Sequence, residues 1–399
     1  MERILIVNKF YYNRGGDCVC AINLEKLLRE KGHEVAVFAM QYDENMQSEY
    51  AKYFASNVEF SGGIGAKLNA AKRIFGMGSI KKEFVRILKD FAPDVVHLHN
   101  IHSYLSPIVA KLAKEYGAKV VWTLHDYKLL CPSYACTRDD LPCELCYKEK
   151  SYVLKHKCMK GNLVASTLAY LEAKYWNKSK LEKYTDIFVC PSKFMKSRME
   201  LGGFEKLKVV CNFVDPVKLD LFKQQNVSVR GDYYIYVGRL SQEKGVITLI
   251  NVAKTLPYKL KVVGGGPLEG QLKNLCAESN NIEFVGHQDA ITVARLLASA
   301  KFAVVPSECY ENNPLSVIEA LCAGTPVVGA KMGGIPELID GNKGIIFESR
   351  NEQMLKQVLV DAYIQEWQYE QIKEFALKEF SPMSYYDKVM SAYSCICNK

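Results

Sequence analysis

The chain has 399 residues, of which 49% are hydrophobic and 24% are charged, and its formal net charge is +8. This composition is ordinary for a globular protein, and the length exceeds what one hydrophobic core normally supports, so we expect two domains. No apolar run approaches the roughly 20 residues that a membrane-spanning helix needs. The N-terminal "MERILIVNKF" predicts a first strand and not a signal peptide. We therefore expect a cytoplasmic protein.

The positive charge lies in the first half of the chain. Residues 1–200 carry 31 Lys and Arg against 22 Asp and Glu, whereas residues 201–399 carry 21 against 22. A basic half suggests an anionic partner, such as a membrane surface, a phosphorylated lipid or a nucleic acid. A chance surplus of surface lysines would give the same numbers. No recognised nucleic-acid-binding motif is present, so we expect no nucleic-acid partner.

The first half alternates short strands with helices. Continuous apolar runs predict strands at 3–8, 34–40, 94–100, 119–126 and 186–192. The periodic segment 20–33 predicts a helix that buries Ala21, Leu24, Leu27 and Leu28 and ends near Gly32. Apolar strands separated by helices are typical of a parallel sheet that is covered on both faces.

The same pattern restarts in the second half. Segment 214–231 has little periodicity and is expected to be a linker; strands are predicted at 233–240, 259–266, 282–287, 302–307, 325–330 and 344–348. The predicted fold is α/β, with two doubly wound parallel-sheet domains at 1–213 and 232–380. A final helical segment, 381–399, is expected to cross back onto the first domain.

Ligands of such sheets bind beyond the carboxyl ends of the strands, and the candidate residues all follow strands. Gly15 and Gly16 in "NRGGD" would let a backbone approach an anion at a helix N-terminus, although a turn that needs a positive φ would also use a glycine pair. The loop lacks the G-x-G-x-x-G fingerprint, which argues against a Rossmann oxidoreductase that binds NAD.

Two cations follow the first strand of the second domain. Arg239 and Lys244 in "GRLSQEKG" suit a diphosphate, because arginine supplies a planar fork and lysine a movable point charge. A solvated loop in which Glu243 neutralises either cation is the alternative.

The stretch "VVPSECYENNPLSVIEALCAGTPVV" contains the start of a helix. Asn313 is predicted to be its N-cap and Pro314 its first residue, which leaves the amides near Leu315 free to bind a phosphate. Glu311 precedes this start, and Glu319 lies about 7.5 Å beyond Pro314 along the helix at 1.5 Å per residue. Two carboxylates beside an anion site indicate hydroxyl recognition at either end of a ligand with sugar rings on both sides of a diphosphate.

These motifs together resemble family 4 of the retaining glycosyltransferases. The resemblance rests on "GRL…EKG", on E-x7-E from Glu311 to Glu319 and on GG-x-PE from Gly333 to Glu337, and it extends to "NRGGD", "TLHD", "VCPS" and the closing helix. Proteins of that family have the GT-B fold, in which two Rossmann-like domains face a cleft.

The resemblance implies a role for each matching residue. Arg239 and Lys244 would hold the nucleotide diphosphate, and Gly16, with its neighbour Gly15, would close over it from the other domain. Glu311 would bind hydroxyls of the donor sugar and Glu319 those of the nucleotide ribose. The backbone would meet sugar and phosphate along Asn312, Asn313, Pro314 and Leu315, and His125 of "TLHD" corresponds to the family's histidine near sugar and acceptor.

The implied reaction is a retaining transfer of a sugar from a nucleotide diphosphate sugar to a hydroxyl of a glycan or lipid-linked glycan, as in bacterial surface-polysaccharide synthesis. Cations and a helix N-terminus favour negative charge on the leaving diphosphate, and no Asp-x-Asp motif occurs, so no metal cofactor is expected for catalysis. A lipid-linked acceptor would place the protein at the inner face of the cell membrane. A nucleotide-sugar epimerase and a non-catalytic nucleotide-sugar-binding protein are the alternatives.

Two further groups could bind metal. His97, His99 and His102 in "HLHNIH" have an imaginable zinc spacing, but similar stretches lie near the acceptor in the resembling family. Five cysteines lie between residues 131 and 158, and a structural zinc is predicted on four of them, with free thiols or a disulfide as alternatives: Cys136, Cys143, Cys146 and Cys158.

Residues 147–183, with nine lysines and three glutamates, predict a basic amphipathic helix that lies on anionic lipid or is simply solvated.

Overall fold

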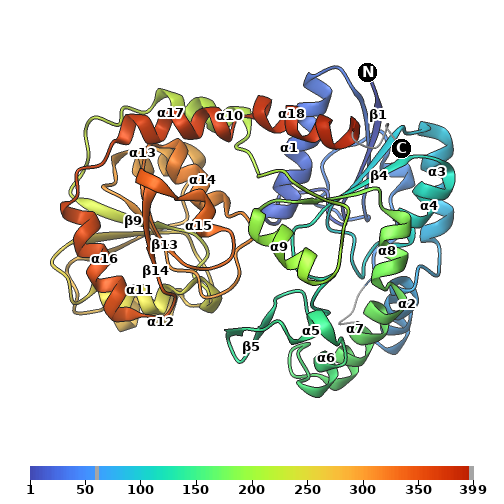
Figure 1. Cartoon of the computed structure of the whole chain (residues 1–399), viewed down its shortest axis with the longest axis horizontal. Helices are drawn as coiled ribbons and strands as arrows, with labels where there is room; N and C mark the ends of the chain where they lie inside the picture. Colours follow the sequence, from blue (N-terminus) through green and yellow to red (C-terminus); the bar gives the residue numbers. More distant parts are fainter. Residues whose placement is uncertain (59–62, 395–399) are drawn as a thin grey trace. The chain divides into compact units, whose positions relative to one another are not determined.

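The computed structural model describes residues 1–58 and 63–394, which form two compact units (Figure 1). Unit 1 comprises Met1–Arg138, Cys143–Val210 and the chain from Tyr386 onward; unit 2 comprises Asp139–Pro142 and Cys211–Tyr385. Within the described residues, no helix has both the length and the apolar character that crossing a membrane requires.

Unit 1 is built on a six-stranded parallel sheet in the order β2-β1-β3-β4-β7-β8. Its strands are β1 (Arg3–Val7), β2 (Glu34–Phe38), β3 (Val95–Leu98), β4 (Lys119–Thr123), β7 (Ile187–Cys190) and β8 (Leu207–Val209). The first five were predicted and are confirmed, because each is a continuous buried apolar run. The prediction missed β8, which has only three residues, all of them half-buried.

The helices of unit 1 follow the apolar periodicity. Helix α1 buries the four predicted residues, although it begins at Gly16, four residues before the predicted start. The helices and short strands are α1 (Gly16–Glu30), η1 (Ala51–Tyr53), α2 (Ile64–Ile74), α3 (Ile80–Phe91), α4 (Ile108–Tyr116), β5 (Thr137–Arg138), β6 (Leu141–Pro142), α5 (Leu145–Lys148), α6 (Tyr152–Lys155), α7 (Leu163–Tyr175), α8 (Lys178–Tyr184) and α9 (Lys193–Leu201).

The end of the chain also belongs to unit 1. Helix α18 (Pro382–Ser394) is part of this unit from Tyr386 onward. The Tyr393 hydroxyl, which is fully buried, lies 2.7 Å from Nδ1 of His97 on β3. The last helix therefore covers the sheet that the first residues of the chain begin.

Unit 2 contains a second six-stranded parallel sheet, in the order β11-β10-β9-β12-β13-β14. All six predicted strands are confirmed: β9 (Tyr233–Val237), β10 (Lys259–Val263), β11 (Ile282–Gly286), β12 (Ala303–Val305), β13 (Val327–Ala330) and β14 (Gly344–Phe347). Alternate side chains enter separate cores on the two faces, as Ile235 does on one side and Tyr234 and Tyr236 do on the other.

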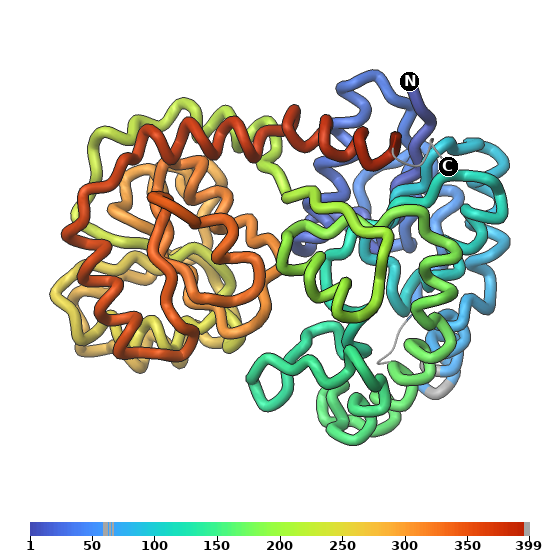
Figure 2. The backbone as a smooth tube through the Cα atoms, viewed as in Figure 1, coloured from blue at the N-terminus to red at the C-terminus, as the bar shows by residue number. Residues whose placement is uncertain are grey.

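The expected linker is partly helical. Helix α10 (Pro216–Gln224), which can be followed in yellow-green in Figure 2, begins after Asp215, whose side chain accepts from the Lys218 amide at 3.1 Å. An acidic N-cap followed by proline is a helix-start signal, and Leu219 and Phe222 are buried. The other helices of unit 2 are η2 (Gln242–Lys244), α11 (Val246–Ala253), α12 (Glu269–Leu275), α13 (Ala290–Ser299), α14 (Leu315–Cys322), α15 (Ile335–Leu338), η3 (Gly341–Lys343), α16 (Glu352–Ile364) and α17 (Tyr369–Glu379).

The strand orders locate the expected ligand sites. Counted within its own unit, the sheet of unit 2 has the order 3-2-1-4-5-6, and that of unit 1 has 2-1-3-4-5-6. The order in which strands are added to the sheet reverses between β9 and β12 in unit 2, and between β1 and β3 in unit 1. Doubly wound sheets bind ligands at the carboxyl edge of this switch point.

Candidate functional site

The carboxyl edge of unit 2 is shaped by glycines. A Cβ atom on Gly264 would lie 2.0 Å from the Gly238 carbonyl oxygen, and one on Gly266 would lie 2.4 Å from that of Leu240. Only glycine lets the loop after β10 pass this close to the end of β9. Gly265 is not crowded in this way and lines a pocket.

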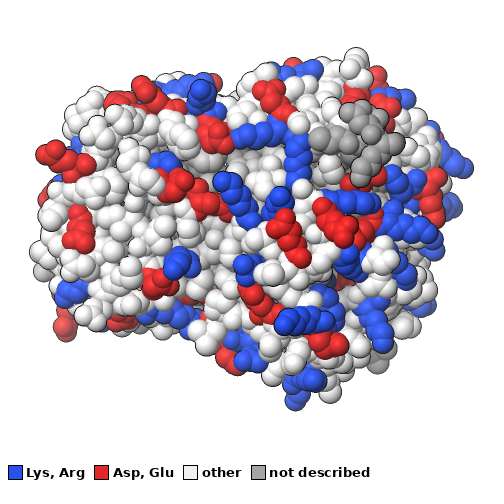
Figure 3. Space-filling view, viewed as in Figure 1, with Lys and Arg blue, Asp and Glu red and all other residues white. Residues whose placement is uncertain are grey.

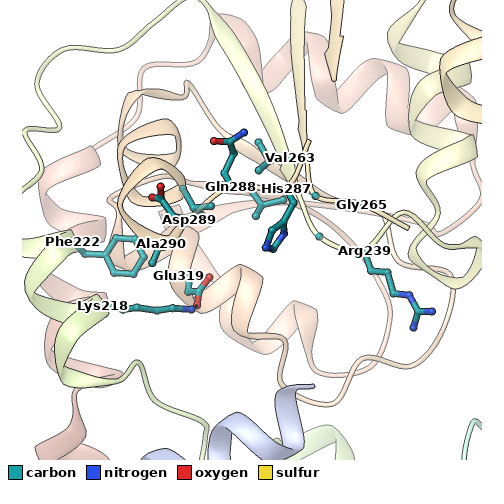
Figure 4. A pocket seen from close by; sticks show the side chains of 14 residues that line it. Lys218, Phe222, Arg239, Val263, Gly265, His287, Gln288, Asp289, Ala290 and Glu319 are labelled. Carbon is teal, nitrogen blue, oxygen red and sulfur yellow. Dashed lines mark hydrogen bonds and ion pairs between the residues drawn. The ribbon is translucent and has the colours of Figure 1, made fainter. Parts of the chain in front are cut away.

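That pocket has a volume of about 610 Å³ and lies entirely within unit 2 (Figure 4). The residues that line it include Lys218, Arg239, Gly265, His287, Gln288 and Glu319. In Figure 4 the Lys218 and Glu319 side chains meet on one side of the pocket, and Arg239 extends on the other. Both carboxylate and cationic groups are therefore available around one cavity.

Glu319 on α14 is paired with a lysine that the sequence did not single out. Lys218 Nζ on α10 donates to Glu319 Oε1 at 2.5 Å. Burial alone would lower the pKa of Lys218, but the Glu319 carboxylate raises it above its ordinary value. Lys218 is therefore charged near neutral pH.

Glu311 is paired as well. Lys244 Nζ donates to Glu311 Oε1 at 2.6 Å, and the Ser307 hydroxyl donates to the same oxygen at 2.7 Å. Burial would lower the pKa of Lys244, but Glu311 raises it. The structure thus brings together two of the predicted site residues, whereas Arg239 is exposed and forms no ion pair within the described residues.

The start of α14 differs from the prediction. The helix begins at Leu315, Pro314 occupies the cap position, and no side chain caps the helix. Asn313 is not the N-cap, because its Oδ1 accepts from the Asn212 amide at 2.8 Å and its carbonyl accepts from Asn212 Nδ2 at 2.9 Å. The first helical amides have no acceptor inside the helix, so the helix start near Asn312 remains suited to an anion.

The loop that carries Glu311 rests on the predicted GG-x-PE motif. Gly333 has φ +61°, and a Cβ there would lie 1.9 Å from the Glu311 carbonyl oxygen. The Gly334 amide donates to the same oxygen at 2.7 Å. These glycines therefore fix the backbone position of Glu311.

The glycine pair of unit 1 lies at the start of α1. Gly15 is the N-cap of α1 with φ −168°, and Gly16 also lies outside the positive-φ region. A positive φ is therefore not the reason for these glycines. A Cβ on Gly16 would meet nothing within 4 Å, which leaves space for a ligand at the helix start.

Three histidine rings stack at the carboxyl edge of unit 1. The ring of His97 lies 4.6 Å from that of His99, which lies 5.2 Å from that of His125. His97 is held by Tyr393 through Nδ1 and by Thr123 through Nε2, the latter at 2.7 Å. Burial lowers the pKa of all three histidines, so they are neutral near pH 7.

The stack selects the tautomer of His125. His99 Nδ1 lies 2.9 Å from His125 Nε2, and His99 Nε2 is buried without a hydrogen-bond partner. A buried N–H without an acceptor is rarer than a buried acceptor without a donor, so His99 donates through Nδ1. Neutral His125 then carries its proton on Nδ1.

A structural zinc was predicted on four cysteines, whereas a metal on the three histidines was considered and disfavoured. Within the chain that the structure describes, no group of three or more His, Cys, Asp or Glu side chains is placed to hold a metal ion. The thiols of Cys136 and Cys146 form hydrogen bonds with Cys131, and these bonds hold the pKa of Cys131 well below its ordinary value. Cys131 is not one of the four predicted ligands. Cys143 and Cys158 are half-exposed. The four predicted ligands are not assembled here, and zinc stays a prediction.

Comparisons with known proteins agree with this geometry. Residues 14–218 match the family model "Glycosyltransferase Family 4", and residues 217–379 match "Glycosyl transferases group 1". The chain is 29% identical, over 84% of its length and 87% of the relative's, to an uncharacterized 42.6 kDa protein in the cps region of Klebsiella pneumoniae.

Solved structures share the fold. The lipopolysaccharide outer core galactosyltransferase WaaB superposes with a TM-score of 0.68 at 16% identity, over 98% of this chain and 99% of that one. Anabaena Alr3699/HepE in complex with UDP gives 0.65 at 16% identity, over 98% and 100%. The family predicted from the motifs is thus confirmed. The chain belongs to glycosyltransferase family 4 and is a glycosyltransferase of the GT-B fold.

Proposed function

We propose that this enzyme transfers a sugar from a UDP-sugar to a hydroxyl of a glycan acceptor and retains the anomeric configuration. The observation that carries the proposal is the carboxyl edge of unit 2, where Arg239 and the Lys218–Glu319 pair line a cavity of about 610 Å³. The Lys244–Glu311 pair follows the ends of β9 and β12 in the same sheet. The UDP bound in the HepE structure supports the choice of UDP as the nucleotide of the donor.

The proposed roles follow from the charges. Arg239 and Lys244 hold the diphosphate, together with the amides at the start of α14 from Asn312 to Leu315. Glu319 takes the ribose hydroxyls and Glu311 the hydroxyls of the donor sugar, because an ionised carboxylate is an acceptor only. Gly15 and Gly16 give an anion access to the start of α1.

The proposed reaction breaks the anomeric C–O bond to the diphosphate and forms a new C–O bond to the acceptor hydroxyl on the same face. The hydroxyl proton passes to the leaving phosphate oxygen. Cationic side chains stabilise the negative charge that develops on the leaving diphosphate, and the proposed reaction requires no metal ion. Glu311 Oε1 is already engaged by Lys244 and Ser307, which suits hydroxyl binding and does not suit a nucleophile.

The glycan acceptor is proposed to be lipid-linked, which would require this protein to contact a membrane surface. Helix α7 exposes Leu163, Val164 and Leu171, and its last turn carries Lys174. On the face shown in Figure 3, lysines and arginines are interspersed with acidic side chains, so charge alone defines no lipid-binding patch there. Sedimentation with phosphatidylglycerol vesicles at low salt tests it. Binding that is lost in Val164→Asp supports a membrane contact, and no binding contradicts it.

The test of the donor site is a panel of UDP-, GDP- and ADP-sugars in thermal unfolding. A ligand at 100 times its Kd raises the unfolding free energy by about 2.7 kcal/mol, so one UDP-sugar should shift Tm while the others do not. Nucleotide release that requires an added glycan, with the product's anomeric configuration read by NMR, tests transfer and retention. Donor turnover without an acceptor to a new sugar isomer would favour an epimerase and contradict the proposal.

A further inference from the structure

Helix α10 forms one wall of the pocket in unit 2, and the roles proposed for the donor residues use none of its side chains. Lys218 and Phe222 are four residues apart on this helix, so they lie on the same face of it, and both line the pocket (Figure 4). Glu319 lines the same pocket from α14. The pocket therefore presents a cation and a carboxylate side by side, from two different helices.

The helix holds Lys218 in a fixed place. Asp215 caps its first turn, because the Asp215 Oδ1 accepts from the Lys218 amide at 3.1 Å. Phe222 is only 2% exposed and belongs to a core of unit 2. Helix α10 also packs against α13 and α14, two helices whose residues line other parts of the pocket. Lys218 is therefore presented by a rigid element and not by a loop.

The ion pair leaves hydrogen-bonding capacity on both partners. An ammonium has three donors. Within the part of the chain that the structure describes, Lys218 Nζ uses one of them, to Glu319 Oε1 at 2.5 Å, and Glu319 Oε2 accepts from no donor. The Lys218 and Glu319 side chains are 35% and 15% exposed, respectively. A ligand in the pocket can therefore both accept from the lysine and donate to the carboxylate.

A phosphate is not the group that this pair suits. An anion at Lys218 would meet the like charge of Glu319, whose Oε1 lies 2.5 Å from the ammonium nitrogen. Arg239 extends on the other side of the pocket (Figure 4), and it forms no ion pair among residues 1–58 and 63–394. Arg239 therefore suits the diphosphate, whereas the Lys218–Glu319 pair suits neutral hydroxyls, each of which donates and accepts.

The position of the pair along α14 corresponds to a ribose. Glu319 lies four residues beyond Leu315, the first residue of the helix, which is about 6 Å at 1.5 Å per residue. In a nucleoside diphosphate whose phosphates lie at the helix start, the ribose directly follows the phosphates, and the base comes after it. The ribose of a ribonucleotide carries two neighbouring hydroxyls, one for each member of the pair.

We propose that Lys218 is a specificity-determining residue of the donor site, and that it donates to one ribose hydroxyl while Glu319 Oε2 accepts from the other. The enzyme then prefers ribonucleotide sugars to their 2′-deoxy counterparts, because either missing hydroxyl leaves a charged group without its ligand contact. This inference rests on the proposed nucleotide-sugar donor and adds a direct contact from α10 to it.

The test is a binding cycle with UDP, 2′-deoxy-UDP and 3′-deoxy-UDP, in which calorimetry gives each Kd. On the wild-type protein each missing hydroxyl should weaken binding by about tenfold or more, as for a hydrogen bond to a charged group. Lys218→Met keeps an unbranched side chain but removes the donors. It should weaken UDP binding by a similar factor, and it should bind the analogue without the lysine-bound hydroxyl about as tightly as UDP.

Two variants serve as matched comparisons. Lys218→Arg keeps the positive charge and its donors, so it should retain part of the preference for UDP over the deoxy analogues. Lys223 lies on the same helix in an exposed pair with Asp220, and Lys223→Met should leave all three Kd values unchanged. Circular dichroism melts show that each variant is folded.

The proposal is overturned if the wild-type protein binds all three ligands equally. It is also overturned if Lys218→Met weakens all three by the same factor or leaves all three unchanged, because a lysine that only supports the fold, or that faces the base, has no coupling to a ribose hydroxyl. A failure of the proposed donor is distinguishable, since it would appear as a wild-type protein that binds no UDP at all.

Discussion

Glu311 and Glu319 are each held by a lysine, Lys244 and Lys218, in the protein without ligand. If they bind hydroxyls as proposed, a sugar or ribose hydroxyl joins or replaces an existing hydrogen bond from a lysine. The pairing orients both half-buried carboxylates before a ligand binds. The sequence predicted the carboxylates, but it could not predict that Lys218 pairs with Glu319 across 101 residues.

Replacing Lys244 should affect both activity and stability. Lys244→Ala leaves Glu311, whose side chain is only 12% exposed, without its cation. We expect kcat/KM to fall by about 10² or more if the lysine stabilises the leaving diphosphate. The unfolding free energy should fall by about 1–3 kcal/mol, because a buried acceptor is left under-satisfied. Steady-state kinetics and urea unfolding measure the two effects.

Lys273→Ala is the matched control for that variant. Lys273 pairs with Glu269 on the exposed surface of α12, and losing such a pair costs at most about 0.5 kcal/mol. Near wild-type turnover in Lys244→Ala would contradict the diphosphate role.

The buried histidines predict acid sensitivity. Burial lowers the pKa of His97 and of His102 to about 3, against about 6.5 in an unfolded chain. Between these values the unfolded chain binds more protons, so the stability that each neutral histidine contributes is complete above pH 6.5 and is lost as pH falls. Each group contributes a slope of about 1.4 kcal/mol per pH unit.

His97→Gln should flatten the dependence of unfolding free energy on pH between about 6 and 4 by that amount. His156→Gln, at an exposed histidine, should leave the slope unchanged. Urea unfolding at a series of pH values decides, and an equal slope in His97→Gln and the wild type would refute the assignment.

At the scale of elements, the continuous apolar runs located the strands well. The helix starts were predicted less well, because a capping side chain can bond elsewhere in the fold. The start of α14 was misassigned because Asn313, a good N-cap by type, is bonded to Asn212 from a segment 101 residues away. Helix α10 was missed although "VDPVKL" contains an N-cap signal, because the signal is short and the flanking residues lack periodicity.

The glycine beneath Glu311 gives a test of loop placement. Gly333→Ala puts a Cβ within 1.9 Å of the Glu311 carbonyl oxygen at a φ of +61°. We expect a loss of about 2 kcal/mol or more of unfolding free energy from strain and displacement, and a drop in kcat/KM of about tenfold or more from a displaced carboxylate.

Gly270→Ala provides the comparison, since a Cβ there meets nothing within 4 Å. Its Tm should stay the same or rise slightly. Unchanged stability in Gly333→Ala would show that the loop yields without cost.

The cysteine-rich segment carries the zinc prediction. Protein expressed with zinc and purified without chelators should contain about one zinc ion per chain if thiolates of this segment bind it. Cys146→Ser should abolish the zinc, while Cys276→Ser, whose thiol bonds to the Leu272 carbonyl on α12, should retain it. Elemental analysis decides; absent zinc together with full titration of the thiols would reject the site.

At the scale of the whole molecule, sequence reasoning recovered the two parallel sheets. The reason is physical: strands buried on both faces are continuous apolar runs. The contacts among Phe10, Tyr42 and Tyr104 were not foreseen, because these residues meet only once β1 and β3 are paired and the intervening loop is folded. Such long-range contacts leave no local pattern.

The Tyr393 contact with His97 has a consequence for the order of assembly. The two residues are 296 positions apart, so a chain emerging from the ribosome makes the sheet of unit 1 first and the helix that completes it last. All of unit 2 is synthesised in between. Until then His97 lacks one of its partners, and the part of unit 1 that buries Tyr393 stays uncovered. A chain truncated before α18 would leave the buried His97 without its Tyr393 contact, so unit 1 is complete only after the whole of unit 2 has been synthesised.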